Sequence, residues 1–128
     1  MGARFTRFLG RHLVCELHGM PQDVLRDKEF LRGLLLRAAE ASGSTVVGDY
    51  FYKFENDMGV TGVVVVAESH LSIHTWPEYG YAAVDVFTCG THTDPWRALE
   101  VLREELRPER VEVTEMTRGI LEQLSLAE

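Results

Sequence analysis

The chain has 128 residues, of which 45% are hydrophobic, which is enough for the core of one globular domain. Its 13 Lys and Arg residues against 20 Asp and Glu residues give a formal charge of -7, which disfavours nucleic acid and anionic lipid surfaces and favours a positively charged substrate. The longest apolar run is too short to cross a membrane, and no signal peptide is evident at the start. Two cysteines, Cys15 and Cys89, are too few for a secreted disulfide scaffold, so we expect a single cytoplasmic domain over residues 1–128 with free thiols.

The first half of the chain predicts a strand, a helix and a hairpin. Leu13, Cys15 and Leu17 alternate with other residues, which predicts a strand over residues 12–18. Asp27 is suited to cap a helix that ends at a Ser-Gly pair. Its apolar stripe consists of Phe30, Leu31, Leu34, Leu35 and Ala38. Residues 45–55 and 60–67 predict two strands, joined by a turn at residues 56–59.

The second half predicts two more strands, a helix and a last strand. Residues 71–76 and 81–88 have strand patterns on either side of a turn that begins at Pro77. Asp94 followed by Pro95 predicts a helix start, and residue 111 begins a last strand that ends at residue 116. The buried stripe of that helix is expected to be Trp96, Leu99, Leu102 and Leu106. The residues after Gly119 are expected to fray.

The order of these elements predicts the fold class. The links in the middle of the chain have hairpin length, so we expect an α+β two-layer sandwich, with a mainly antiparallel sheet and two helices packed on one face. Four consecutive valines at residues 63–66 place apolar side chains on both faces of one strand. We therefore expect the second face to be covered, most simply by another copy of the protein.

Residues 68–81, with the sequence ESHLSIHTWPEYGY, place hydroxyl, imidazole and carboxylate groups in one short segment. Together with residues 82–90, this segment resembles the processing and catalytic block of bacterial S-adenosylmethionine decarboxylases, and the resemblance extends from Gly10 to Trp96. It covers about two-thirds of the chain, and a contiguous block of this length is far more specific than a short motif.

The resemblance implies a self-cleaving proenzyme. Ser69 would attack the carbonyl of Glu68, convert the amide to an ester, and become a pyruvoyl group while the chain separates into residues 1–68 and 69–128. His74 matches the family's base for this processing. Thr61 stands where the family has a serine hydroxyl, and because threonine keeps the hydroxyl, we expect processing to survive.

The resemblance also implies the reaction of the processed enzyme. The pyruvoyl ketone would form a Schiff base with S-adenosylmethionine and act as the electron sink as CO2 leaves, with no added cofactor and no metal. The product would be S-adenosylmethioninamine, the aminopropyl donor for spermidine synthesis. Cys89 matches the family's proton donor, Glu78 its carboxylate for the ribose hydroxyls, and Phe54 its adenine-stacking aromatic, across a one-residue shift.

The distance between Ser69 and His74 bears on the assembly. In one continuous strand, five steps of about 3.3 Å hold the two residues roughly 16 Å apart and on opposite faces. Either the chain bends between them, or Ser69 of one protomer meets His74 of another. The family's homodimers, which have sites across the interface, match the second arrangement.

Several other interpretations compete with this one. Taken singly, Ser69, His74 and Cys89 are ordinary strand residues, and a metal site at His70, His74, Cys89 and His92 is disfavoured because strand spacing separates its ligands. A related pyruvoyl enzyme could decarboxylate ornithine or arginine, and Glu78 with Phe54 favours the nucleoside instead. A non-catalytic regulatory paralogue would not need to retain Ser69, His74 and Cys89 together.

Overall fold

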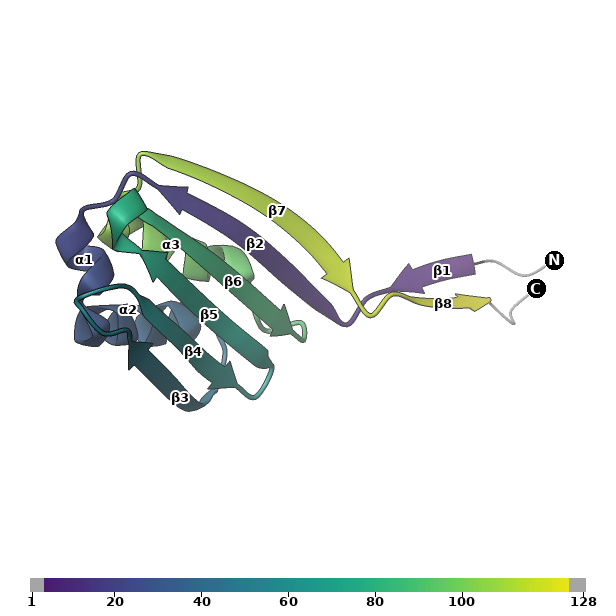
Figure 1. Ribbon diagram of the computed structural model, residues 1–128. Coiled ribbons are helices and arrows are strands. Elements are labelled where there is room, and N and C mark those ends of the chain that lie inside the picture. The colour runs from purple at the N-terminus through teal and green to yellow at the C-terminus, as the bar shows by residue number, and fades with distance from the viewer. Residues whose placement is uncertain (1–3, 125–128) are drawn as a thin grey trace.

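The computed structural model describes residues 4–124, and its main feature is a six-stranded antiparallel sheet (Figure 1). The strand order is β3-β4-β5-β6-β2-β7. The strands are β2 (Gly10–His18), β3 (Val46–Lys53), β4 (Val60–Val66), β5 (Ser69–Trp76), β6 (Tyr81–Cys89) and β7 (Arg110–Arg118). Every neighbouring pair runs antiparallel, which confirms the predicted α+β class.

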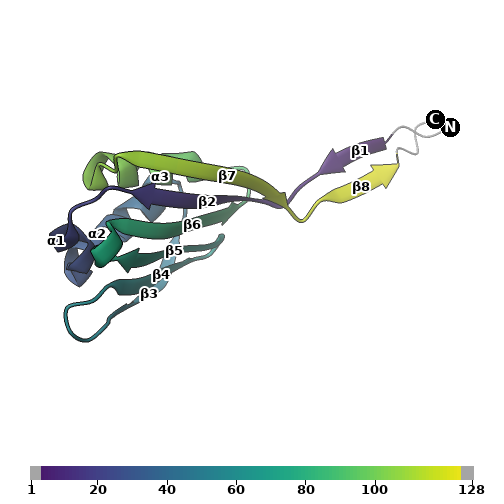
Figure 2. The same cartoon turned by 45° about the horizontal axis from the view of Figure 1, so that its top comes forward.

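The helices lie on one face of this sheet (Figures 1 and 2). The main ones are α2 (Lys28–Ala41) and α3 (Pro95–Leu106). Both begin as predicted, because the Asp27 side chain accepts from the Phe30 N–H and the Asp94 side chain accepts from the Trp96 N–H, each at 3.0 Å. A short helix, α1 (Gln22–Arg26), and a 3-10 turn, η1 (Pro77–Tyr79), complete the set among the described residues.

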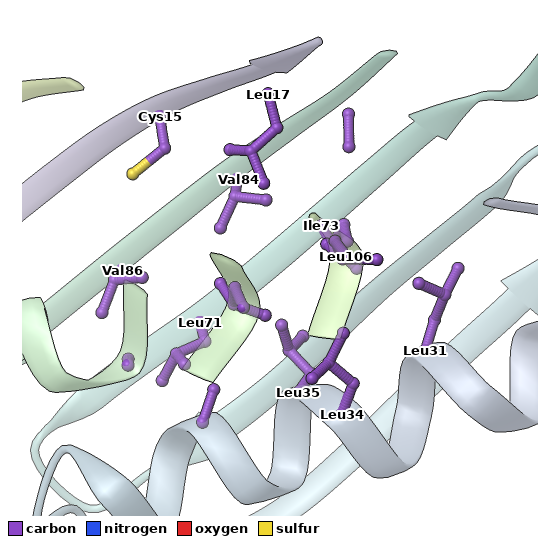
Figure 3. Packing of buried hydrophobic residues seen from close by; sticks show 14 of the residues in the cluster. Cys15, Leu17, Leu31, Leu34, Leu35, Leu71, Ile73, Val84, Val86 and Leu106 are labelled. Atoms are coloured by element: carbon purple, nitrogen blue, oxygen red, sulfur yellow. The ribbon is translucent and has the colours of Figure 1, made fainter. Parts of the chain in front are cut away.

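The core lies between this face and the helices, where leucines of α2 meet the strand residues of the sheet (Figure 3). Leu71 and Ile73 of β5 are fully buried there, as the alternation predicts. One predicted core residue is exposed: Trp96 is 37% exposed, and its indole N–H donates to Glu115 at 2.8 Å. An indole that finds a polar partner at the surface has less reason to enter an apolar core. Phe30, predicted in the buried stripe of α2, is only partly buried.

The opposite face of the sheet carries half-buried polar and aromatic side chains, and within the described part of the chain no helix covers it (Figure 2). Asp85 accepts a hydrogen bond from the Ser72 hydroxyl at 3.2 Å and lies 3.0 Å from Nε2 of His12. The Tyr81 hydroxyl donates to Glu16 at 2.7 Å, and desolvation together with this carboxylate raises the pKa of Tyr81 to about 12. Val65 also points to this face and is 44% exposed.

The two ends of the described chain form an arm that projects from the sheet (Figures 1 and 2). Strand β1 (Arg4–Arg7) pairs antiparallel with β8 (Leu121–Leu124). Because β2 and β7 are already paired, their continuations beyond Gly10 and Arg118 leave the sheet side by side. The expected fraying after Gly119 is therefore wrong as far as Leu124.

Candidate active site

A tight, strained turn joins β4 to β5. Val66 pairs with Ser69, so that only Ala67 and Glu68 form the connection. Ser69 has a φ of +155°, a region in which a residue with a side chain is strained by roughly 1–3 kcal/mol and which persists only when the surroundings hold it. The Ser69 hydroxyl lies 3.3 Å from Nδ1 of His70. The peptide bond before Ser69 is thus in a distorted part of an otherwise regular hairpin.

The side chain of Glu68 is anchored beside this turn. Its carboxylate accepts from the backbone N–H of Thr45 at 2.9 Å and lies 2.7 Å from Nε2 of His92. The Thr45 hydroxyl is a third, longer contact at 3.4 Å. The Thr45 N–H, followed by His92, lowers the pKa of Glu68 below its ordinary value. Both partners come from outside the hairpin: Thr45 immediately precedes β3, and His92 lies in the loop after β6.

His74 lies near the other end of β5, directly opposite Thr61 of β4. The Thr61 hydroxyl oxygen and the His74 Nδ1 are 3.1 Å apart in a half-buried setting. This contact fixes the ring orientation. In the tautomer whose Nδ1–H donates to Thr61, Nε2 keeps a free lone pair that can accept a proton.

A cavity of about 410 Å³ opens beside His74 and Thr61. Its lining includes Phe54, which directly follows β3, and Glu78, from η1, which the sequence predicted as substrate-binding residues. The antiparallel register brings these four predicted residues together although they are far apart in the sequence. An aromatic ring, a carboxylate and a half-buried imidazole around one cavity suit a ligand with an aromatic base, hydroxyl groups and a positive charge.

Sequence reasoning did not identify the other residues of this cavity. Trp76, Met58 and Thr75 line it, and each of them is within three residues of a predicted position in the sequence. Gly59 is a further missed residue, because a Cβ there would clash with the Thr75 carbonyl oxygen. Only glycine lets the 56–59 turn approach β5 this closely. The sequence showed a glycine at the end of the turn, but it did not show that this glycine packs against Thr75 of β5.

Cys89 lies at the end of β6, in a second cavity of about 990 Å³ at the base of the arm. Gly10 and Arg11 of β2 line the same cavity. The other thiol, Cys15, is fully buried in the core, and desolvation raises its pKa to about 12. Of the two free cysteines, only Cys89 therefore stands where a substrate can reach it.

The predicted site residues form two groups at opposite ends of the sheet. Ser69 pairs with the end of β4, and the register of β5 with β6 places Cys89 at that same end. His74, with its cavity, lies at the other end of one uninterrupted strand. Five strand steps of about 3.3 Å separate Ser69 from His74 by roughly 16 Å. Of the two arrangements that the sequence left open, the bend within one chain is absent from the described strand.

Within the described residues, the chain has neither a candidate metal-binding cluster nor a helix that could cross a membrane. Over residues 4–124, no three His, Cys, Asp or Glu side chains are grouped closely enough to hold a metal ion. In the same part of the chain, the helices are too short or too polar for any of them to span a membrane.

Comparisons with known proteins agree over nearly the whole chain. A sequence model of the family "S-adenosylmethionine decarboxylase" matches residues 11–119. The S-adenosylmethionine decarboxylase proenzyme of Caldicellulosiruptor saccharolyticus is 48% identical over 115 residues, which are 90% of this chain and 92% of that protein. The proenzyme of Thermotoga maritima is 48% identical over 120 residues, 94% of this chain and 92% of its own. The crystal structure of the Aquifex aeolicus adenosylmethionine decarboxylase superposes with a TM-score of 0.84 at 39% identity, covering 90% of this chain and 94% of that one.

Proposed function

The chain belongs to the S-adenosylmethionine decarboxylase family, and we propose that it is a proenzyme that cleaves itself between Glu68 and Ser69 to make its own pyruvoyl group. Its activity is the decarboxylation of S-adenosylmethionine, the reaction of the family. The observation that carries the proposed cleavage site is the strained φ of Ser69 in a two-residue turn, inside the matched segment.

The cleavage proceeds in steps whose atoms balance. The Ser69 Oγ bonds to the carbonyl carbon of Glu68, the bond from that carbon to the Ser69 nitrogen breaks, and the hydroxyl proton passes to the nitrogen. A base then removes the Cα proton of residue 69. The main-chain carboxylate of Glu68, which was held in the ester, leaves from Cβ of residue 69, and a carbon–carbon double bond forms between Cα and Cβ. Protonation at Cβ, addition of water and loss of ammonia complete the conversion. The strained turn favours the first step, because opening the amide releases the strain.

The proposed site suits a pyruvoyl group, because Ser69 lies at the same end of the sheet as the cavity that contains Cys89, and not inside the packed core. When formed, the pyruvoyl supplies an electrophilic ketone that captures the substrate amine and accepts electrons as CO2 leaves. His74, held by Thr61, takes up a proton during processing. Cys89 gives a proton to the former α-carbon of the substrate. Phe54 and Glu78 hold the adenine and the ribose.

We further propose that the working enzyme is a homodimer of cleaved protomers. Ser69 and His74 are too far apart in one chain, whereas a two-fold arrangement that sets the Ser69 end of one sheet against the His74 end of the partner creates two equal sites. The surface available for this contact is the uncovered sheet face, with Val65 and the half-buried Tyr81 and Asp85. Stacking two such faces would remove their apolar side chains from contact with water, which is favourable.

The two fragments stay together after cleavage in this proposal. Residues 1–68 supply β3, β4 and β2, and residues 69–128 supply β5, β6 and β7. In the sheet order, β5 and β6 lie between β4 and β2. The fragments are therefore interleaved through backbone hydrogen bonds and one shared core, so that breaking one peptide bond does not separate them. The free thiols of Cys15 and Cys89 suit a cytoplasmic enzyme.

An intact mass spectrum of the purified protein under denaturing conditions tests the cleavage. The expected result is two fragments, residues 1–68 and residues 69–128, with the second lighter by one ammonia than the same peptide with an N-terminal serine. A single uncut chain after long incubation would overturn the proposal and favour the regulatory paralogue.

Mixed dimers test the shared site. We expect neither Ser69→Ala nor His74→Ala to cleave alone, because each homodimer lacks one of the two groups. Co-expressed with distinguishable tags, the His74→Ala chain is expected to cleave, because its Ser69 meets the His74 of the Ser69→Ala partner. Failure of the His74→Ala chain to cleave in isolated mixed dimers would place both groups in one protomer and overturn the shared site.

A further inference from the structure

The mechanism proposed above uses the carbonyl of Glu68 but not its side chain, which is nevertheless one of the most anchored carboxylates of the described chain. It is 12% exposed and has two short contacts, to the Thr45 N–H at 2.9 Å and to the His92 Nε2 at 2.7 Å. Glu68 is the residue immediately before the proposed cleavage point. A contact at its side chain therefore acts one residue away from the strained Ser69.

The two partners of Glu68 are themselves fixed to the body of the protein. The carbonyl of Thr45 accepts from the Ala67 N–H at 2.8 Å, which ties the start of β3 to the same turn. His92 lies in the loop between β6 and α3, and this loop is joined to the end of α2 where the Asp94 N–H donates to the Ser42 carbonyl at 2.8 Å. The turn is thus connected through one carboxylate to two segments that the hairpin alone does not reach.

We propose that His92 and Thr45 are positioning residues for self-cleavage, which hold the Glu68 side chain so that the bond between Glu68 and Ser69 stays in the strained turn. This inference rests on the proposed self-cleavage. A backbone outlier persists only where its surroundings leave the chain no relaxed alternative. The hairpin fixes the turn from the Ser69 side, and the Glu68 contacts fix it from the other. Released from them, Glu68 can rotate and let the φ of Ser69 relax, which moves the hydroxyl away from the carbonyl that it attacks.

The same contacts outlast the reaction, because the cleavage alters the main chain of Glu68 but leaves its side chain unchanged. Glu68 becomes the C-terminal residue of the first fragment and gains a second carboxylate. The Thr45 N–H and His92 then keep this new end beside the start of β5. If the Glu68–His92 pair were only an exposed ion pair without this role, it would neither affect the cleavage rate nor hold the new C-terminus, since exposed ion pairs usually contribute little to stability.

The test measures the cleavage rate of newly synthesised chains, followed by gel or mass spectrometry in a cell-free translation. We expect His92→Ala to slow cleavage about three- to fivefold, because the imidazole is 58% exposed and solvent weakens its contact with the carboxylate. His92→Gln can still donate to the carboxylate and is expected to restore most of the rate. Glu105→Gln, which removes an exposed pair with Arg37 at 3.5 Å, is the matched control and should cleave like the wild type.

A double-mutant cycle identifies the contact responsible. Glu68→Gln is expected to slow cleavage as well, and adding His92→Ala to it should cost little more, because both changes remove the same interaction. Two additional readouts separate positioning from folding: the thermal midpoint of the unprocessed chains, measured in the Ser69→Ala background, and kcat of chains that have completed cleavage. Both are expected to be unchanged.

The outcomes are distinguishable. A wild-type rate for His92→Ala, additive effects in the cycle, or a rate loss matched by a lower thermal midpoint would each overturn the positioning role. An uncut wild-type chain would instead remove the proposed self-cleavage, and the positioning role would fall with it.

Discussion

The two ends of strand β5 are built differently. At its start, Ser69 has a φ of +155° in a two-residue turn, and its hydroxyl lies 3.3 Å from the neighbouring His70. Near its end, His74 sits in regular register opposite Thr61, with a hydrogen bond across the strand pair and a cavity beside it. One end stores strain, whereas the other has unstrained side chains in fixed orientations.

This difference separates two tasks that one active site has to combine. The strained end suits a peptide that must break once, and the ordered end suits groups that must stay unchanged through every turnover. A single rigid strand keeps them roughly 16 Å apart, at about 3.3 Å per residue. If the two ends meet only across a dimer, changes at each end should affect cleavage and decarboxylation in different proportions.

The largest effect on cleavage rate is expected at the ordered end, for His74→Gln. Without a base for the Cα proton, cleavage should slow by about 10²- to 10⁴-fold, the usual contribution of general base catalysis. The uncut fraction in timed mass spectra measures it. Glu105→Gln is the control, because it changes only an exposed pair between the helices, with Arg37 at 3.5 Å. Near-normal cleavage of His74→Gln would show that His74 is not the base and that the base lies elsewhere.

Cys89→Ala, at the strained end, should affect decarboxylation and not cleavage. We expect normal cleavage but a decarboxylation rate lower by about 10²-fold, since the proposed mechanism gives Cys89 the role of proton donor to the substrate and no role in processing. The assay is CO2 release by the fully cleaved protein. Cys15→Ala is the matched thiol control: its side chain is fully buried, so the change should lower stability and leave kcat alone. Equal loss of both steps in Cys89→Ala would contradict the division of tasks.

Glu78→Gln tests the cavity at the ordered end. A neutral amide keeps the shape but weakens the hydrogen bonds that the carboxylate accepts from hydroxyl groups, which should raise KM for S-adenosylmethionine about tenfold, equivalent to about 1.4 kcal/mol, and leave kcat nearly unchanged. Steady-state kinetics of the cleaved enzyme measure both constants. A lower kcat at constant KM would show that Glu78 acts in the chemical step and not in binding.

Much of the fold followed from the sequence because its signals are local. Alternation predicted β2, and Asp27 and Asp94 predicted the helix starts, which depend on residues only a few positions away. Helix α1 was missed, because five residues are too few to display a helical period. The β1–β8 arm was missed because each of its strands is supported by the other, at the far end of the chain.

The site shows the same limit at longer range. The family resemblance named Phe54 and Glu78, but only the register of the strands brings them to the cavity that contains His74. The φ of Ser69 left no trace in the sequence, since serine has no preference for that region. The partnership of His92 with Glu68 spans 24 residues and two strands, and no periodicity reports such a contact.

The smallest effect is expected for Thr61, which the family resemblance places where a serine is expected. Thr61→Val keeps the shape but removes the oxygen that lies 3.1 Å from the His74 Nδ1, so that the ring loses a single hydrogen bond. Such a bond contributes about 0.5–1.5 kcal/mol, and we expect cleavage to slow only about threefold. Thr61→Ser should restore the wild-type rate, because it returns the hydroxyl without the methyl group. If Thr61→Val were as slow as His74→Gln, the hydroxyl would act on the reacting carbonyl itself. The ordered end of β5 would then supply two reacting groups instead of one base and its support.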